Sequence, residues 1–220
     1  MLEKISAIIL LIILSPFLVI IALLIIISSG QPIFYKHKRC GFQYEEFDII
    51  KFRTMHPNNG PQLTEYKDNR ITNIGKILRK FKLDELPQLI NIIKGDMGFI
   101  GPRPEAIEIV NNHRENFAYL SKIKPGVTDI NSIIFKDESI IFKNLNINRY
   151  ENEILPIKSH LAIKTLENKN IFQKGILVLI SIISIINHNF SLHLVRLFFL
   201  PNLELDFRIK LNKLLSKQIF

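Results

Sequence analysis

The sequence predicts an α+β fold that is mostly helical, in a chain whose 220 residues suffice for one domain of ordinary size and a small appendage. Three observations carry this prediction. Residues 5–29 form a long apolar stretch, apolar residues recur at helical spacing in the centre of the chain, and residues 46–55 alternate as in a strand. The second half is expected to add amphipathic helices suited to a membrane interface.

The composition combines apolar character with positive charge, because 47% of the residues are hydrophobic and the formal net charge is +9 at pH 7. That combination is typical of proteins that lie on an anionic membrane surface or handle phosphorylated ligands. The cations form no arm or tail and no nucleic-acid-binding motif is present, so we expect no nucleic acid partner. Cys40 is the only cysteine, which excludes an internal disulfide and a cysteine-based zinc cluster and indicates a reducing, cytosol-facing domain.

The apolar stretch at residues 5–29 would make a helix about 37 Å long, enough to cross a hydrocarbon core of about 30 Å. Ser15 and Pro16 interrupt it at its midpoint. Pro16 removes the hydrogen bond to the carbonyl of Ile12, which the Ser15 hydroxyl can satisfy by bending back. The stretch is therefore either a kinked transmembrane helix or a re-entrant helix that enters and leaves on one face. The basic residues 36–39 place the following domain on the cytoplasmic side in both cases.

Residues 46–55 are predicted to form a strand in which Lys51 and Arg53 point the same way, about 7 Å apart. That separation suits the two phosphates of a diphosphate, although a solvated strand face is also a usual place for paired cations. A loop over residues 56–70 follows, and loops of that length are typically functional or mobile.

Two helices are predicted next, over residues 73–81 and 85–94, with Gly95 as the residue that ends the second. Asp84 and Glu85 lie at their joint. Helix physics favours an N-cap role for Asp84 and a solvated surface position for Glu85, while Pro87 excludes a reciprocal capping box. The same position also suits chemistry. A carboxylate kept ionised by the helix dipole and nearby cations can attack phosphorus, and an adjacent Glu can hold Mg²⁺.

The segment at residues 95–105 places Pro102 and Pro104 on either side of Arg103. The two prolines stiffen the backbone that presents this guanidinium, which suits a phosphate or nucleotide; the alternative is a tight turn with an exposed Arg. Gly98 and Gly101 are expected to let the backbone approach a ligand or adopt positive φ. The cations that would join the acid pair around a nucleotide diphosphate and Mg²⁺ are Lys51, Arg53, Arg79 and Arg103.

The C-terminal half is predicted to be helical over residues 149–170, with Pro156 starting a new helix. Residues 176–186 are too few to span a bilayer and form either a buried core helix or, together with residues 190–199, an interfacial element. The tail from Leu203 is amphipathic and basic, and is expected to lie on the membrane or to cover the domain.

The phrase at residues 84–105, "DELPQLINIIKGDMGFIGPRPE", closely resembles the bacterial sugar transferase family, the monotopic phosphoglycosyl transferases or undecaprenyl-phosphate sugar phosphotransferases. It is preceded by "KFRTM" and "GKILRKFKL" and followed by "KPGVTD", and the resemblance extends over about residues 5–187. It implies transfer of a sugar 1-phosphate from a UDP-sugar to undecaprenyl phosphate with release of UMP, the step that initiates polysaccharide or glycoconjugate biosynthesis. Exopolysaccharide, lipopolysaccharide and capsule pathways all fit.

The resemblance also implies roles for single residues. Asp84 would carry a covalent phosphosugar and Glu85 would bind Mg²⁺, with the substrate phosphates contacted by Lys51, Arg53, Arg79 and Arg103. Ser15 and Pro16 would break a re-entrant helix, so that the catalytic domain lies on the cytoplasmic face of the bacterial inner membrane.

The expected domains are a membrane-inserted helix at residues 1–30, a catalytic domain at 31–187 and an amphipathic tail at 188–220. A homodimer is compatible with the family.

Two departures from the family pattern limit the prediction. Gly98 stands where many relatives have Ser, and residues 125–139 replace a glycine-rich pattern that ends in a Gly-Arg cation. The candidates for that missing contact are Lys136, Asp137 and Glu138, and the sugar is left open. Two other functions also stay open: a membrane-anchored scaffold, and another Mg²⁺-dependent phosphotransfer enzyme such as a lipid phosphatase. Release of UMP separates both from the sugar transferase.

Overall fold

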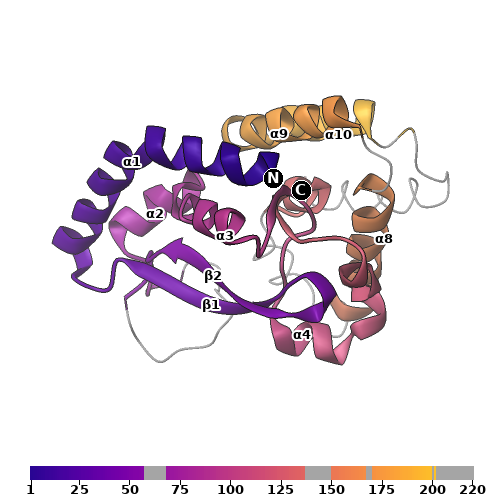
Figure 1. Ribbon diagram of the computed structural model, residues 1–220, viewed down its shortest axis with the longest axis horizontal. Coiled ribbons are helices and arrows are strands. Elements are labelled where there is room, and N and C mark those ends of the chain that lie inside the picture. The colour runs from indigo at the N-terminus through magenta and orange to yellow at the C-terminus, as the bar shows by residue number, and fades with distance from the viewer. Residues whose placement is uncertain (57–67, 137–149, 167–169, 200, 202–220) are drawn as a thin grey trace.

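The computed structural model describes residues 1–56, 68–136, 150–166, 170–199 and 201. Most of the loop predicted at residues 56–70 lies outside these residues, as do Asp137, Glu138 and the tail from Leu203. The described part is an α+β fold made mostly of helices, as predicted (Figure 1). The elements in chain order are α1 (Leu2–Ser29), β1 (Phe34–Cys40), η1 (Phe42–Tyr44), β2 (Glu46–Phe52), α2 (Asn73–Lys80), η2 (Leu83–Glu85), α3 (Gln88–Lys94), β3 (Gly98–Ile100), α4 (Ile107–Asn112), η3 (Arg114–Ser121), β4 (Gly126–Thr128), α5 (Ile130–Ile134), η4 (Tyr150–Ile154), α8 (Leu155–Leu166), α9 (Ile171–Ile186) and α10 (His188–Phe198).

Helix α1 is, among the described residues, the one helix long and apolar enough to cross a membrane. It contains Pro16, and Figure 1 shows that it changes direction along its length. The Ser15 hydroxyl donates a hydrogen bond of 2.8 Å to the carbonyl of Ile12. This is the bond predicted from the sequence, so the carbonyl that Pro16 leaves without an amide partner is satisfied within the helix.

Both halves of α1 pack on the same domain. In the first half, Ala7 is fully buried against Leu89 and Ile92 of α3. In the second half, Ile21 and Ile25 are buried in a separate cluster with residues of β2 and α2. The two halves therefore lie along one body instead of projecting away from it, and the remaining surface of α1 is exposed and apolar.

The strands form two small sheets. β1 and β2 pair antiparallel with Phe34 opposite Phe52, and β3 pairs parallel with β4. The predicted strand at 46–55 is confirmed as β2, although it ends at Phe52. Its partner β1, which contains the basic residues 36–39, was not predicted. The short β3–β4 pair was not predicted either, because strands of three residues are too short to show an alternating pattern.

The largest core cluster joins η3, α5, α8, α9 and α10. Within α9, Leu177 and Ile180 are buried in this core whereas Leu179 and Ile182 are 61% and 53% exposed. One face of α9 is therefore a buried core face, and the opposite face is exposed and apolar, as expected of an interfacial helix. Pro156 lies in the first turn of α8, as expected for a residue that starts a helix.

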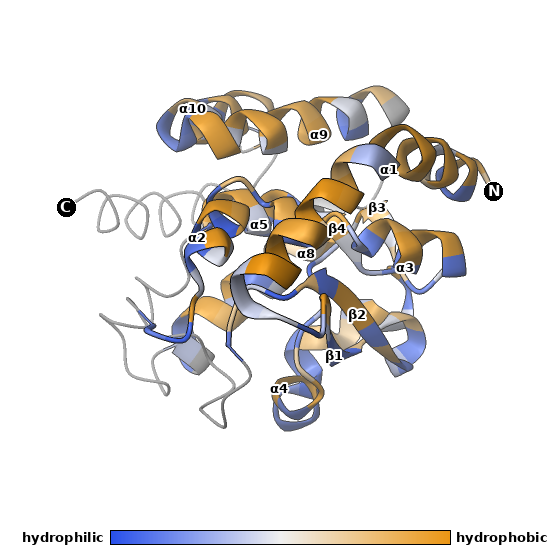
Figure 2. Cartoon of the chain, turned by 90° about the vertical axis from the view of Figure 1, so that its left-hand side faces the viewer, coloured by the Kyte–Doolittle hydropathy of each residue, from blue (hydrophilic) through white to orange (hydrophobic). Residues whose placement is uncertain are grey.

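One side of the molecule is markedly apolar. Figures 1 and 2 both place α9 and α10 at the top with the first half of α1 near them, while the second half of α1 runs downward. Figure 2 shows these helices mostly in the hydrophobic colour, with the β1–β2 hairpin below them. The large apolar side chains that α9 and α10 expose are Phe172, Leu179, Ile182, Ile186, Phe190, Leu197 and Phe198. Exposed apolar surface of this extent is typical of a membrane or protein contact.

Candidate active site

The two acids lie in η2, the short 3₁₀ turn that joins α2 to α3. Lys82 precedes this turn in the left-handed conformation, with φ of 56°, and α3 then begins at Gln88 with Pro87 as its N-cap residue. The predicted N-cap role for Asp84 is therefore wrong, because the helix starts several residues later than the apolar pattern indicated. Asp84 is only 8% exposed, and within the described chain its Oδ1 atom has no hydrogen-bond partner.

Burial raises the pKa of Asp84, and the charge of Glu85 adds to this, while Lys51, Lys82 and Arg79 act in the opposite direction. The expectation that a helix dipole and cations would stabilise this ionised carboxylate does not hold, because desolvation outweighs them. A buried charged oxygen without a hydrogen bond is costly. A bond formed at that oxygen would remove the charge and relieve the cost, which is a favourable property in a nucleophile.

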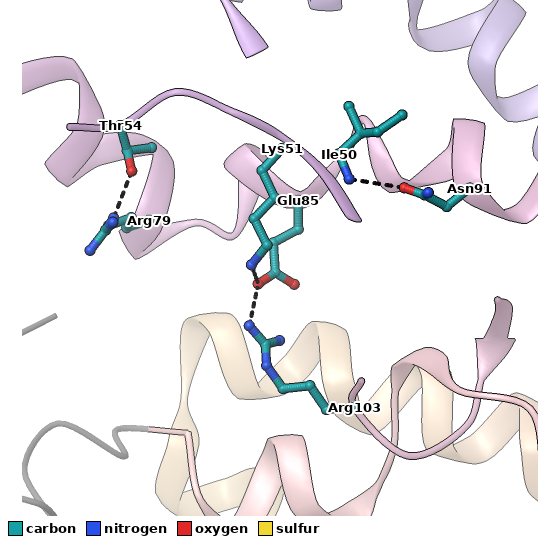
Figure 3. Close-up of polar contacts among 7 residues, drawn as sticks. All are labelled: Ile50, Lys51, Thr54, Arg79, Glu85, Asn91 and Arg103. Carbon is teal, nitrogen blue, oxygen red and sulfur yellow. Dashed lines mark hydrogen bonds and ion pairs between the residues drawn. The ribbon is translucent and has the colours of Figure 1, made fainter. Parts of the chain in front are cut away.

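Glu85 has the opposite electrostatic environment. Its Oε1 atom accepts hydrogen bonds from Lys51 Nζ at 2.8 Å and from an Arg103 guanidinium nitrogen at 3.1 Å (Figure 3). Burial alone would raise the pKa of Glu85, but Arg103 and Lys51 hold it well below the usual value. The predicted solvated position for Glu85 is wrong, since its side chain is 10% exposed. Adjacent carboxyl groups with pKa values moved in opposite directions are typical of sites that give each acid a different task.

Lys51 and Arg53 do not act together. Lys51 reaches Glu85, and burial lowers the Lys51 pKa despite the attraction of that carboxylate. The guanidinium of Arg53 instead donates to the backbone carbonyls at the end of α1, at 2.7 Å to Ser29, 2.6 Å to Gly30 and 2.7 Å to Gln31. The structure therefore does not bring Arg53 to the acid pair, and it serves to hold the C-terminal end of α1.

Arg79 lies in the last turn of α2 and directs its Nε atom to the hydroxyl of Thr54 at 2.8 Å (Figure 3). It is close enough to Asp84 to lower the pKa of that acid. Thr54 is buried and follows β2 directly. Sequence reasoning missed Thr54 as a residue that orients Arg79, although it stands inside the quoted phrase "KFRTM".

Arg103 is presented by a loop that is anchored on both sides. After it, the Glu105 carboxylate accepts a hydrogen bond of 2.7 Å from Lys158 of α8. Before it, Gly101 lies so close to β4 that an added Cβ would come within 2.3 Å of the Lys124 carbonyl oxygen. Gly101 is thus required for close backbone packing, and it does not adopt positive φ. The stiff presentation of Arg103 has the physical basis that its two neighbouring prolines indicated.

A cationic pocket of about 90 Å³ lies beside Arg103. Its lining residues are Lys82, Arg103, Asn131, Ser132, Phe135, Lys136 and Lys158. The Asn131 Nδ2 atom donates a hydrogen bond of 3.0 Å to the Lys158 carbonyl oxygen. The buried Oδ1 atom of Asn131 has no hydrogen-bond partner among the described residues. Lys136, a candidate from the sequence, lines this pocket. Asn131, Ser132 and Lys158 were missed, and the only signal was that residues 125–139 depart from the family pattern.

An apolar pocket of about 240 Å³ also borders η2. Its lining residues are Leu10, Leu14, Lys82, Glu85, Leu86, Leu89, Phe99 and Val127. Lys82 lines both pockets, and Glu85 of the apolar pocket bonds Arg103 of the cationic pocket. The acid pair is therefore flanked by two spaces of opposite chemical character.

Among the described residues, no group of three or more His, Cys, Asp and Glu side chains is arranged to hold a metal ion. Asp84 and Glu85 nevertheless fit Mg²⁺, which is commonly held by one or two carboxylates together with substrate phosphate oxygens. The Asp84 oxygen without a hydrogen-bond partner is consistent with such a cation.

Comparison with known proteins identifies relatives of this chain. Residues 1–167 match the family described as bacterial sugar transferase. An N-acetylgalactosaminephosphotransferase of Aeromonas hydrophila that acts on UDP-N-acetylgalactosamine and undecaprenyl phosphate is 38% identical over 120 residues, which is 52% of this chain and 28% of the relative. The exopolysaccharide production protein ExoY of Sinorhizobium fredii is 36% identical over 146 residues, 58% of this chain and 65% of the relative.

A UDP-glucose:undecaprenyl-phosphate glucose-1-phosphate transferase of Xanthomonas campestris is 39% identical over 134 residues, covering 57% of this chain and 28% of the relative. The aligned part thus spans between about a quarter and two thirds of these three relatives.

Proposed function

The chain belongs to the bacterial sugar transferase family, and on that premise we propose that it transfers a sugar 1-phosphate from a UDP-sugar to undecaprenyl phosphate and releases UMP. The relatives' names, which include undecaprenyl phosphate and UDP-sugars, support this reaction class. The observation that carries the proposal is the pairing of a buried Asp84, whose Oδ1 has no hydrogen-bond partner in the described structure, with Glu85 held ionised by Lys51 and Arg103. The product would be the lipid-linked sugar on which a polysaccharide or glycoconjugate is built.

In the first half of the reaction, an Asp84 carboxylate oxygen attacks the β-phosphorus of the donor, the one that carries the sugar. A bond forms between that oxygen and phosphorus, and the bond from phosphorus to the bridging oxygen breaks. UMP leaves with the bond's electron pair, and the sugar phosphate stays on Asp84 as an acyl phosphate. Arg103 and Arg79 would bind the diphosphate and the charge that develops on UMP.

In the second half, a phosphate oxygen of undecaprenyl phosphate attacks the same phosphorus. The bond to Asp84 breaks, the carboxylate is restored, and the lipid diphosphate sugar is released. Burial makes the free Asp84 carboxylate poorly solvated, so the uncharged carboxyl group of the acyl phosphate is not strongly disfavoured relative to the free carboxylate. This suits a residue that alternates between the two forms. Glu85 and Asp84 would hold Mg²⁺, which when bound neutralises part of the charge on the diphosphate.

The contacts at both ends of α1 support a re-entrant helix on the cytoplasmic face of the inner membrane. Near its start, Lys4 Nζ donates to the Lys94 carbonyl at 3.3 Å, and at its end Arg53 binds the carbonyls of residues 29–31. Both ends are thereby attached to one domain, whereas a transmembrane helix would have one end on the far side. The apolar surfaces of α9 and α10 would lie at the same interface.

Cysteine labelling tests this topology in a Cys40→Ala background. Leu2→Cys marks the start of α1, and Asn112→Cys on the exposed side of α4 is the matched control. We expect both to resist a membrane-impermeant maleimide in intact cells and to react after permeabilisation. Labelling of Leu2→Cys alone in intact cells would show that α1 crosses the membrane.

UMP release tests the reaction itself. Purified protein is incubated with Mg²⁺ and a panel of UDP-sugars, with and without undecaprenyl phosphate. We expect a stoichiometric burst of UMP and an acid-labile sugar phosphate adduct from one donor alone, and turnover when the lipid is added. Asp84→Asn should lose both. Phosphate release from the lipid without UMP would indicate a phosphatase, and no release of either product from folded protein would indicate a scaffold.

A further inference from the structure

The apolar pocket is not explained by the donor. Of its two polar lining residues, Glu85 belongs to the acid pair and Lys82 lies two residues before Asp84. The other six are Leu10, Leu14, Leu86, Leu89, Phe99 and Val127. A UDP-sugar consists of a pyrimidine, two sugars and a diphosphate, none of which gains from a wall of leucines. The chemistry of this pocket therefore points to an occupant with a hydrocarbon part.

The position of the pocket restricts that occupant further. Leu10 and Leu14 come from the first half of α1, directly before the Ser15–Pro16 break, and Leu10 is 39% exposed. Leu86 follows the acid pair in sequence, so the pocket extends from the membrane-facing helix to the site of chemistry. Its occupant must reach η2 with one end and the bilayer with the other.

The charges at the pocket suit a phosphate at the inner end. Lys82, in its left-handed conformation, lines the pocket two residues before Asp84. A phosphate beside Lys82 would place its oxygens near Asp84, while the attached chain would lie against Leu10 and Leu14. A molecule with a phosphate head and a long apolar chain meets both requirements.

The size of the pocket indicates how much of the chain it holds. A volume of about 240 Å³ corresponds to roughly eight water-sized atoms at about 30 Å³ each. An isoprenyl unit has five carbon atoms, so one to two units fit and the remainder would continue into the bilayer. We propose that the apolar pocket binds the first one or two isoprenyl units of the acceptor, next to its phosphate. This inference rests on the proposed function, because it takes the acceptor to be a polyprenyl phosphate.

A variant that fills the pocket tests this. Leu10→Trp adds bulk at a half-exposed position that folding should tolerate, and Ile13→Trp, 66% exposed on the same half of α1, is the matched control. We expect Leu10→Trp to raise the KM for undecaprenyl phosphate about tenfold or more, the cost of excluding a few methylene groups, and to leave the donor-only UMP burst unchanged. An unchanged acceptor KM, or the same rise in Ile13→Trp, would overturn the proposal.

A binding measurement keeps the test independent of turnover. The chain contains no tryptophan, so Phe99→Trp places a single fluorophore in the pocket. In nanodiscs of defined phospholipid, we expect a saturable change in its emission on adding undecaprenyl phosphate or the two-unit neryl phosphate, and a weaker response to unbranched decyl phosphate. Ile13→Trp should not respond. A Phe99→Trp signal that phospholipid alone saturates would mean that acyl chains occupy the pocket and would refute the proposal, even if the wild type releases UMP.

The two failures are distinguishable. Absence of a UMP burst from wild-type protein with every donor refutes the proposed function. Absence of a polyprenyl-specific tryptophan signal, or of a selective effect of Leu10→Trp on the acceptor, refutes the pocket assignment alone.

Discussion

The two pockets that flank η2 share Lys82 but are otherwise built from different parts of the chain. The apolar pocket takes its walls mainly from α1, η2, α3 and the β3–β4 pair, whereas the cationic pocket takes most of its walls from α5, the two residues that follow it, and α8. One contains a single cation and six apolar side chains; the other contains four cations. The contact between Glu85 and Arg103 joins them.

Two pockets of this kind allow a small domain to serve two substrates of opposite character. A donor that is polar throughout and an acceptor that is mostly hydrocarbon do not need one compromise site. Each can approach the acid pair from its own side, provided that a covalent step on Asp84 carries the sugar phosphate between them. The comparison then predicts that substitutions in the cationic pocket affect the donor, those in the apolar pocket affect the acceptor, and those at the shared residue affect both.

The largest selective effect is expected at Arg103. Arg103→Leu removes a charged hydrogen-bond donor that lines only the cationic pocket. Hydrogen bonds to charged groups contribute about 1.5–3 kcal/mol, so kcat/KM for the UDP-sugar should fall about 10- to 150-fold while the KM for undecaprenyl phosphate stays the same. Steady-state kinetics with each substrate varied in turn measures both. A comparable rise in the acceptor KM would break the division between the pockets.

A smaller effect on both substrates is expected at Lys82. Lys82→Met keeps the length of the side chain and removes its charge from both pockets. We expect each KM to rise by about tenfold or less, as for one partly solvated charge contact. Lys80→Met removes an exposed lysine two residues away and is the matched control. An effect of Lys82→Met on one substrate alone would assign Lys82 to that substrate's pocket.

Features that depend on neighbouring residues were easier to predict from the sequence than contacts between distant residues. The hydrogen bond from Ser15 to the Ile12 carbonyl in α1 and the end of α3 at Gly95 were predicted because each depends on residues within one helical turn. The different partners of Lys51 and Arg53 were not predicted, because strand alternation ends with β2 at Phe52 and cannot specify which partner each cation meets. Local sequence thus predicts backbone shape better than it predicts side-chain partners.

The candidate site follows the same rule. Asp84, Glu85, Arg79 and Arg103 were identified within one continuous phrase, and the structure gathers them around η2. The pocket residues Asn131 and Lys158 meet only through tertiary packing of α5 on α8. No spacing in the sequence marks a contact between positions that far apart. The start of α3 was misplaced for a related reason, since the apolar pattern begins before the helical hydrogen bonds do.

The smallest expected effect is on thermal stability. It tests whether the ionised Asp84 carboxylate destabilises the folded protein at its buried position. Because burial raises the folded-state pKa of Asp84 above its ordinary value of 3.8, the stabilisation associated with the protonated acid is present below that value and is lost as pH rises through the folded-state pKa. Asp84→Asn carries no charge and should therefore have a Tm higher than the wild type at neutral pH, on the order of a few degrees. The difference should shrink as pH falls towards 3.8. Thermal unfolding in detergent across this pH range measures it, with Asp48→Asn at an exposed position of β2 as a control for general charge effects. A wild type more stable than Asp84→Asn at neutral pH would mean that the carboxylate is stabilised where it lies, and the argument that ester formation relieves a buried charge would fail.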